Sequence, residues 1–259
     1  MRHAFERGDF GDARAGPILD AGCGAGDNAN WLAARGHEVV GFDISEGALA
    51  EARRRSRDVF GAAIEDAGGS AEFVRASGLD LASSAVARAA ARQPGGFAVV
   101  LDSALLHCLD DASQRTYVGE LAKVARGADI DQTLTCSSSA TSKSIRLTFG
   151  RIVRSRRDLE AQRKRFDYAH RLEDLSSAQV TRCGGRLYLG CFSDANPDPW
   201  SNPRRISEAQ IRALFDAPAW RVLDVAPVWY ERPRAHAGAS GMGAFTMAHW
   251  AVVERKGAL

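Results

Sequence analysis

The chain has 259 residues, of which 45% are hydrophobic, and its formal net charge is +2 at pH 7. A chain of this length buries a full core as one large domain, or as one domain with an insertion, without disulfides or metals. The near-neutral charge excludes a global basic field that would attract nucleic acid or an anionic membrane, and no apolar run approaches the roughly 18 residues of a membrane span.

Alternating strands and helices are predicted over the first half of the chain. The expected strands are Pro17–Ala21, His37–Asp43, Ala71–Arg75 and Phe97–Asp102. The expected helices are Asn28–Arg35, Glu46–Ala67, Ser83–Arg92 and Ala112–Arg126. The strands are apolar without alternation, which indicates burial on both faces, and their alternation with helices predicts an α/β fold with a doubly wound parallel sheet.

Residues 127–182 interrupt this alternation of strands and helices within the single domain expected for 1–259. The segment begins with a Ser/Thr-rich patch and continues with a basic stretch, in which Ile152, Leu159 and Phe166 form a thin helical stripe. It holds too few large apolar groups to offset the roughly 1–2 kcal/mol per residue that ordering costs. We expect an insertion that forms a mobile surface excursion and adds no strand, with its two ends close together. A sequence artefact is the alternative, since deletion restores an ordinary "VARCGGRLYLGCF".

Predicted strands and helices resume after the insertion. The expected elements are the strand Arg186–Cys191, the helix Ser207–Phe215 and the strands Trp220–Ala226 and Ala244–Glu254. Ser207 and Gln210 have the spacing of a capping box, which predicts the start of the helix.

The stretch "ILDAGCGAGDNANWLAARGHEVVGFDIS", residues 18–45, carries the main functional signal. Gly22, Gly24 and Gly26 stand between a strand and a helix, where glycine permits a sharp turn and the close approach of a ligand. Asp43 ends the next strand, where a carboxylate accepts hydrogen bonds from both hydroxyls of a ribose. The pattern predicts a site for a nucleotide-like cofactor.

Position 27 distinguishes between two such cofactors. A dinucleotide fingerprint needs a third glycine there, and this chain has Asp27, whose carboxylate would repel a pyrophosphate. Asp20 adds a second anion that we expect on the same rim. Two anions favour a cationic ligand end, such as the ammonium and sulfonium of S-adenosylmethionine.

The same stretch resembles the first two motifs of class I S-adenosylmethionine-dependent methyltransferases. Within that class the chain is most similar to small-molecule enzymes of the thiopurine and tellurite methyltransferase-like kind. The later segments VVLDSALLHCLDDASQRTYVGELAKVAR, GGRLYLGCFSDANP and PRRISEAQIRALF resemble further parts of those enzymes. The resemblance implies a Rossmann-like, seven-stranded, mostly parallel sheet with helices on both faces. Its strand order is 3-2-1-4-5-7-6, and the last strand, Ala244–Glu254, is antiparallel.

The resemblance also implies a role for each matching residue. The methionine part of S-adenosylmethionine would lie against Asp20, Gly22, Gly24, Gly26 and Asn28. The ribose would bind Asp43, the adenine would lie beside Ile44, and Asp102 would close the floor. Ser77 stands where the family often has an acidic residue that bonds the adenine amino group, and Asp80 is the alternative.

His107 follows the fourth strand, close to where the transferred methyl group is expected. It is a candidate catalytic residue that accepts a proton or orients the methyl acceptor, in which case His107→Ala would lower turnover by about a hundredfold or more. The alternative is a buried histidine satisfied by backbone groups. Cys108 and Cys191 are interpreted as core residues, and no metal site is predicted.

The sequence therefore predicts methyl transfer from S-adenosylmethionine to a small-molecule nucleophile of thiol, metalloid or amine type. The five cysteines are widely spaced and odd in number, and no signal peptide precedes the first strand, which predicts a cytoplasmic location. The basic run 151–171 is interpreted as a solvated helix face, so neither nucleic acid nor a membrane is an expected partner. The alternatives are a nicotinamide-dependent oxidoreductase and a catalytically degenerate protein that binds S-adenosylmethionine.

Overall fold

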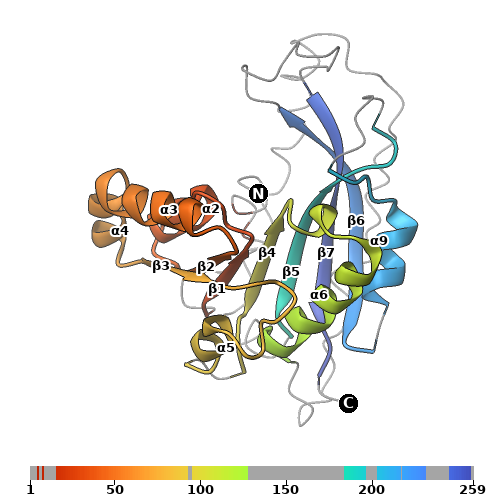
Figure 1. The fold of residues 1–259 in the computed structure, drawn as a ribbon, viewed down its shortest axis with the longest axis horizontal. Helices are drawn as coiled ribbons and strands as arrows, with labels where there is room; N and C mark the ends of the chain where they lie inside the picture. Colours follow the sequence, from red (N-terminus) through yellow and green to blue (C-terminus); the bar gives the residue numbers. More distant parts are fainter. Residues whose placement is uncertain are drawn as a thin grey trace.

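The computed structural model describes Phe5, Gly8 and residues 16–92, 95–127, 184–196, 203–216, 218–231 and 245–257. Seven strands in these ranges form one sheet in the order β3-β2-β1-β4-β5-β7-β6 (Figure 1). The strands are β1 Ile18–Ala21, β2 Glu38–Asp43, β3 Ser70–Arg75, β4 Val99–Ser103, β5 Arg186–Phe192, β6 Trp220–Glu231 and β7 Phe245–Arg255. The predicted strand order is confirmed.

The strand directions also agree with the prediction. β3, β2, β1, β4 and β5 pair in parallel, whereas β7 pairs antiparallel with both β5 and β6. β7 therefore occupies the place predicted for Ala244–Glu254. β6 continues past its predicted end at Ala226, and Pro227 is tolerated within it because β6 is an edge strand, where a missing N–H need not break a ladder.

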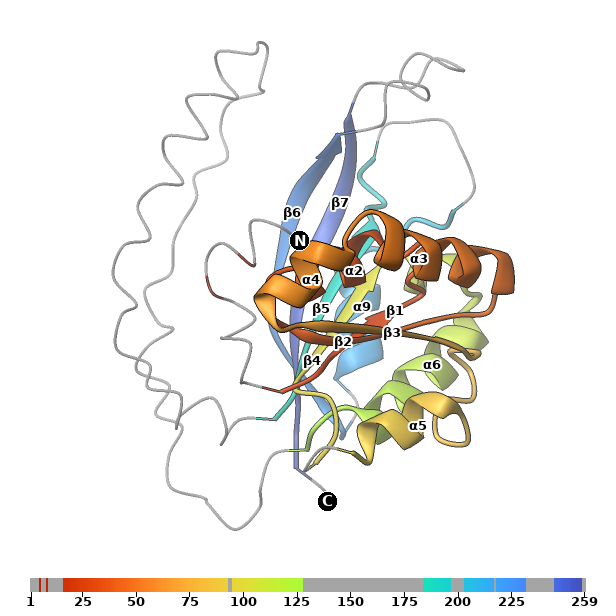
Figure 2. The same cartoon turned by 90° about the vertical axis from the view of Figure 1, so that its left-hand side faces the viewer.

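Helices cover both faces of the sheet, as Figure 2 shows for α2, α3 and α4 on one side of β1–β3 and α5 and α6 on the other. The described helices are α2 Asp27–Ala33, α3 Glu46–Asp58, α4 Gly61–Ala67, α5 Ala85–Ala90, α6 Asp111–Val124, α9 Glu208–Phe215 and the 3-10 helix η1 Leu106–Cys108. In β1, Ile18 packs into one hydrophobic cluster and Leu19 into the other. Successive side chains of a strand point to opposite faces, so a continuous apolar run supplies both layers of the core.

The predicted helix Glu46–Ala67 is wrong in one respect, because it is two helices. α3 ends at Asp58 and α4 begins at Gly61. Glycine stabilises a helix poorly, and the change of direction lets the half-buried Ile64 pack against the cluster that contains Leu32 and Leu49. The apolar contact of Ile64 therefore stabilises the fold by more than the interruption of the helix costs.

The structure describes both ends of the predicted insertion. The backbone N–H of Gly185 donates to the carbonyl of Arg126 at 2.7 Å, so the chain leaves and re-enters the domain at one place, as expected. Residues 128–183, including the expected helix at Ile152–Phe166, lie outside the described residues.

Candidate functional site

The carboxyl ends of three parallel strands bring the predicted cofactor residues to one edge of the sheet. Ala21 of β1 pairs with Phe42 of β2 and with Asp102 of β4, so the three strands end side by side. The glycine turn, Asp43 and the loop after β4 all begin at this edge. Ligands of open α/β sheets bind at this kind of edge.

The three glycines of the turn have different environments. All have positive φ angles, 64° at Gly22, 53° at Gly24 and 75° at Gly26. A Cβ on Gly26 would lie 2.9 Å from the side chains of Ala52 and Phe73, and one on Gly22 would lie 3.0 Å from Leu105. A Cβ on Gly24 would meet no described atom within 4 Å. The protein's own packing therefore requires two of the glycines, and the third leaves open space for a ligand.

Asp43 holds the turn and retains capacity for a ligand. Its two carboxylate oxygens each accept one backbone N–H at 2.9 Å, from Gly24 and from Ser45. A carboxylate has about four lone-pair sites, so hydrogen bonds from two ribose hydroxyls remain possible. The next residue, Ile44, is 67% exposed, which places a large apolar side chain beside the carboxylate, as expected for contact with an adenine ring.

Asp20 is buried at the start of α2. Its Oδ2 accepts the backbone N–H of Ala29 at 3.1 Å and satisfies one donor in the first turn of a helix that has no side-chain cap of its own. Burial raises the pKa of this carboxyl group from 3.8 to about 7, and the carboxylates of Asp102, Asp27 and Asp43 also raise it. A buried carboxyl group among other acids favours a cationic ligand group such as an ammonium. Asn28 lies half-buried in the first turn of α2.

Asp102 organises the loop that follows β4. Its carboxylate accepts the backbone N–H groups of Leu105 and Leu106 and the hydroxyl of Tyr117, at 2.8 Å from Leu105 and 3.0 Å from Tyr117. Burial raises its pKa to about 6. Within the same loop Ala104 has a φ of 88°, a left-handed conformation that is costly for a residue with a side chain. The loop is thus held in one strained shape beneath the site.

His107 is 2% exposed and connects this loop to β5. Its Nδ1 accepts the backbone N–H of Phe192 at 3.0 Å, and its ring stacks on the Phe192 ring with a centroid separation of 4.6 Å. The proton of the neutral ring is therefore on Nε2. Burial lowers the pKa of His107 to about 4. This geometry favours the alternative interpretation, a buried histidine satisfied by backbone, because the lone pair of Nδ1 is already engaged.

Asp27 forms an ion pair that the sequence did not predict. Its Oδ1 lies 2.6 Å from Nη2 of Arg55, and its side chain is 74% exposed. Asp27 is the first residue of α2, and its side chain reaches across the surface to Arg55 of α3. The guanidinium of Arg55 therefore offsets the charge with which Asp27 was expected to repel a pyrophosphate.

Ser77 and Asp80 lie in the turn after β3, and both are engaged locally. Ser77 Oγ accepts the backbone N–H of Leu79 at 3.2 Å, and Asp80 Oδ1 accepts the hydroxyl of Ser83 at 2.5 Å. Each oxygen keeps a free lone pair. A contact from either residue to an adenine amino group stays a prediction.

The cysteines differ from one another. Cys191 is 1% exposed and lies in the core, as expected, and burial raises the pKa of its thiol. The interpretation of Cys108 as a core residue is wrong, because Cys108 is exposed and its thiol donates to the Ala104 carbonyl at 3.2 Å. Cys23, within the glycine turn, is half-buried, and burial together with Asp20 and Asp43 raises its pKa. None of these environments stabilises a thiolate nucleophile.

The sequence analysis missed a polar cluster at the end of β5. Ser193, which follows β5, lies 3.0 Å through its Oγ from Nε2 of His249 on β7, and Asp194 Oδ1 lies 3.7 Å from the same nitrogen. His249 is 9% exposed. No sequence motif links residues 56 positions apart, so only the pairing of β5 with β7 reveals the cluster.

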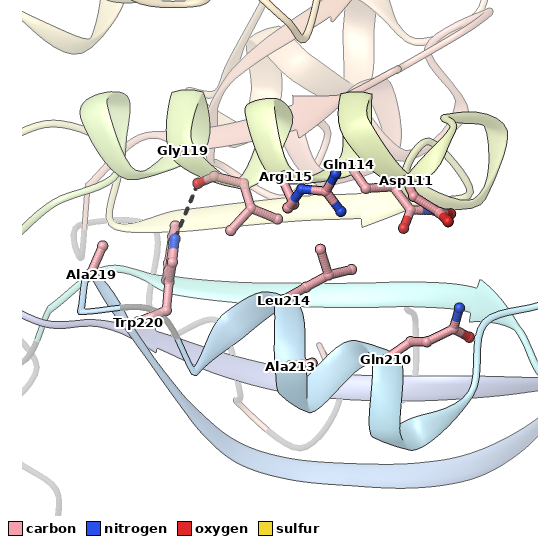
Figure 3. A pocket seen from close by; sticks show the side chains of 10 residues that line it. Asp111, Gln114, Arg115, Gly119, Gln210, Ala213, Leu214, Ala219 and Trp220 are labelled. Atoms are coloured by element: carbon pink, nitrogen blue, oxygen red, sulfur yellow. Dashed lines mark hydrogen bonds between the residues drawn. The ribbon is translucent and has the colours of Figure 1, made fainter.

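A groove of about 480 Å³ lies elsewhere, between α6 and α9 (Figure 3). Val118, Leu214 and Trp220 supply its apolar wall, and the Trp220 indole N–H donates to the carbonyl of Val118 at 3.2 Å. None of the predicted site residues lines it. No described helix has the length and apolar character needed to cross a membrane. Within the described ranges, no three His, Cys, Asp or Glu residues gather as a possible metal site.

One protein family matches the first part of this chain. Residues 12–137 match the family model of thiopurine S-methyltransferase, just under half of the 259 residues. A search of curated proteins gave no match.

Solved structures with the same fold include several methyltransferases. An S-adenosylmethionine-dependent methyltransferase from Methanosarcina mazei is 14% identical, with 94% of this chain and 93% of that chain covered and a TM-score of 0.56. Magnesium protoporphyrin IX methyltransferase from Synechocystis, with bound S-adenosylhomocysteine, is 14% identical, with coverages of 97% and 78% and a TM-score of 0.52. A 1,6-didemethyltoxoflavin-N1-methyltransferase from Burkholderia thailandensis is 16% identical, with coverages of 99% and 76% and a TM-score of 0.50.

The fold is that of the class I S-adenosylmethionine-dependent methyltransferases, and the family match places residues 12–137 near the thiopurine methyltransferase group. The family match supports S-adenosylmethionine as the cofactor. Neither the family match nor these neighbours support the alternative of a nicotinamide-dependent oxidoreductase.

Proposed function

We propose that this enzyme methylates a small-molecule nucleophile of thiol, metalloid or amine type in the cytoplasm, without a nucleic-acid or membrane partner. The observation that carries the proposal is the cofactor half of the carboxyl edge, which we define as the ends of β1, β2 and β4. There the open space at Gly24 lies beside Asp43 and the exposed Ile44. The porphyrin and toxoflavin named for two structural neighbours support an acceptor of small-molecule size.

The residues of this half, together with Ser77 in the turn after β3, have distinct proposed roles toward the cofactor. Asp43 binds the ribose hydroxyls, Ile44 packs against the adenine, and Ser77 bonds the adenine amino group. Asp20 attracts the ammonium group, because a buried carboxyl ionises readily beside a cation. Asp102 keeps the floor of the site in place through its contacts to Leu105, Leu106 and Tyr117.

Methyl transfer places modest chemical demands on the protein. The bound cofactor supplies an activated methyl group on a sulfonium, and an in-line displacement requires the acceptor to be aligned with it. Alignment of the two reactants lowers the barrier by roughly 7–11 kcal/mol. A rigid turn and a fixed loop after β4 serve this purpose.

Residues 127–182 are proposed to be an insertion in a single domain that spans 1–259, either a surface excursion or a sequence artefact. The hydrogen bond from the Gly185 N–H to the Arg126 carbonyl supports this, because it joins the two ends of the insertion directly. The segment is not required for the edge described above.

Calorimetric titration tests the cofactor assignment. We expect the protein to bind S-adenosylhomocysteine and not NADH, and to release S-adenosylhomocysteine from S-adenosylmethionine when a small thiol is present. Binding of S-adenosylhomocysteine without turnover on thiols, amines or selenite-derived acceptors would establish the catalytically degenerate alternative. Binding of NADH alone would overturn the proposal.

A further inference from the structure

The cluster of Ser193, Asp194 and His249 lies on the acceptor half of the carboxyl edge, which we define as the ends of β5 and β7. The last residue pair of β4 with β5 is Ser103 with Gly190, and the next residue of β5, Cys191, pairs with His249. His249 therefore stands one residue beyond the end of β4. Two strand spacings separate β7 from β4, roughly 10 Å, which a small acceptor molecule can span.

The acceptor half is joined to the cofactor half by direct contacts. Asp102 holds the loop that carries His107, and His107 Nδ1 binds the backbone N–H of Phe192. Phe192 precedes Ser193, whose hydroxyl contacts His249. The cluster is thus positioned by the same loop that forms the floor of the cofactor site.

The hydrogen bonds around Ser193 accommodate a His249 ring that carries its proton on Nε2. Ser193 Oγ accepts the backbone N–H of Ala195 at 3.1 Å, and its own proton is directed to Asp194 Oδ1 at 3.5 Å. Nε2 of His249 lies 3.0 Å from the same oxygen, and in the tautomer that carries the ring proton on Nε2 it donates to that oxygen. In that tautomer the lone pair is on Nδ1.

Nδ1 of His249 is buried and has no hydrogen-bond partner in the described part of the chain. A buried polar atom without a partner is costly, by about 1–3 kcal/mol, so each such atom calls for an explanation, such as an ordered water, a ligand or a role in a reaction. The carboxylate of Asp194, 3.7 Å from Nε2, would stabilise the imidazolium that forms when Nδ1 takes a proton. His107 lacks this arrangement, because its Nδ1 is already occupied by Phe192.

We propose that His249 is the general base of the reaction, with an acceptor that carries a proton on its nucleophile, such as an alkyl thiol. The inference rests on the methyltransferase function proposed above. As the nucleophile forms its bond to the methyl carbon, the carbon–sulfur bond of the sulfonium breaks and its electron pair stays on sulfur. The proton of the nucleophile moves to Nδ1 of His249 and later to solvent. The positive charge thus passes from the sulfonium to the imidazolium.

Two thiol probes test this role. 2-Mercaptoethanol is mostly protonated at pH 7, whereas 4-nitrothiophenol is already a thiolate and needs no base. His249→Gln retains an N–H donor for Ser193 but has no basic lone pair. We expect this variant to lower kcat with 2-mercaptoethanol by about 10²-fold or more, with little change for 4-nitrothiophenol.

Graded variants and binding measurements complete the test. Asp194→Asn removes the charge beside Nε2 while keeping the side-chain shape, and we expect a smaller loss with 2-mercaptoethanol only. Each variant should bind S-adenosylhomocysteine as the wild type does, which verifies an intact fold. An equal loss of kcat with both thiols, or no loss with either, overturns the role of His249 and leaves the proposed function standing. A wild-type protein that binds S-adenosylhomocysteine but methylates neither thiol overturns the thiol acceptor itself, and the base proposed for it.

Discussion

The two halves of the carboxyl edge differ in how far apart along the chain their contacting residues lie. In the cofactor half, Asp102 bonds Leu105, three positions away, and Asp43 bonds Gly24, 19 positions away. In the acceptor half, His249 lies 56 positions from Ser193. The first half is formed by the ends of three parallel strands, each followed by its own loop and helix, and the second exists only where a late antiparallel strand enters the sheet.

The two histidines show what this difference means for chemistry. His107 has the position in the sequence that suggests catalysis, yet its Nδ1 accepts the Phe192 N–H and burial lowers its pKa to about 4. His249 has no sequence signal, yet its Nδ1 is buried without a partner in the described chain. Which nitrogen is free depends on hydrogen bonds from distant segments, and position along the chain does not determine it.

The largest expected effect is in the cofactor half. Asp43→Ala removes charge-assisted bonds to the ribose and the anchor of the Gly24 N–H, so S-adenosylhomocysteine should bind roughly ten- to a hundredfold more weakly in calorimetry. Ser45→Ala, which removes only the cap that accepts the Ala48 N–H, is the control and should leave affinity nearly unchanged. Equal affinity in wild type and Asp43→Ala would exclude this carboxylate from the site.

The next effect is a dependence of cofactor affinity on pH. With a pKa of about 7, Asp20 is roughly one-eleventh ionised at pH 6 and ten-elevenths ionised at pH 8, so affinity for S-adenosylhomocysteine should be about tenfold weaker at pH 6. Asp20→Asn should bind weakly at both values. A wild-type affinity that is flat between pH 6 and 8 would contradict a role for the buried carboxylate toward the ammonium group.

The ionisation of Asp20, which strengthens cofactor binding as the pH rises, lowers the stability of the ligand-free protein. The pKa of Asp20 is raised in the folded state, so its contribution to stability is complete below about pH 4 and is lost as the pH rises through about 7. Thermal unfolding without ligand should show this loss, and Asp20→Asn should reduce it.

A smaller effect is expected in the loop that joins the two halves. His107→Ala leaves the Phe192 N–H without an acceptor, which should cost about 1–3 kcal/mol of stability and lower the melting temperature by several degrees. We expect turnover on 4-nitrothiophenol and on 2-mercaptoethanol to fall by the same modest factor, below about tenfold. A hundredfold loss confined to 2-mercaptoethanol, with an unchanged melting temperature, would instead make His107 the base.

The smallest effect is expected from the insertion. Removal of residues 127–182, with Arg126 joined to Cys183, should leave S-adenosylhomocysteine affinity within about twofold of wild type and should not lower the melting temperature. The reason is that Gly185 already bonds Arg126 across the base of the segment. A deletion variant that fails to fold, or that loses affinity, would show that the segment is an integral part of the domain.

Much of the fold was predictable because its signals are local. Continuous apolar runs such as Ile18–Ala21 supply both core layers, and the capping box of Ser207 and Gln210 sets the start of α9, as predicted. The break between α3 and α4 was not predictable from helical periodicity. It depends on where Ile64 finds apolar contact, which the rest of the fold decides.

The sequence by itself determined the alternation of strands and helices, the glycine turn and the position of Asp43 at the end of β2. These features follow from steric limits on the backbone and from contacts between near neighbours. The tertiary structure alone decided that Asp27 pairs with Arg55, that His107 binds the backbone of β5, and that Nδ1 of His249 is buried without a partner in the described part of the chain. Each of these depends on which distant side chains meet across the packed layers, and hydrogen bonding to those partners fixes the charge and protonation of a buried group.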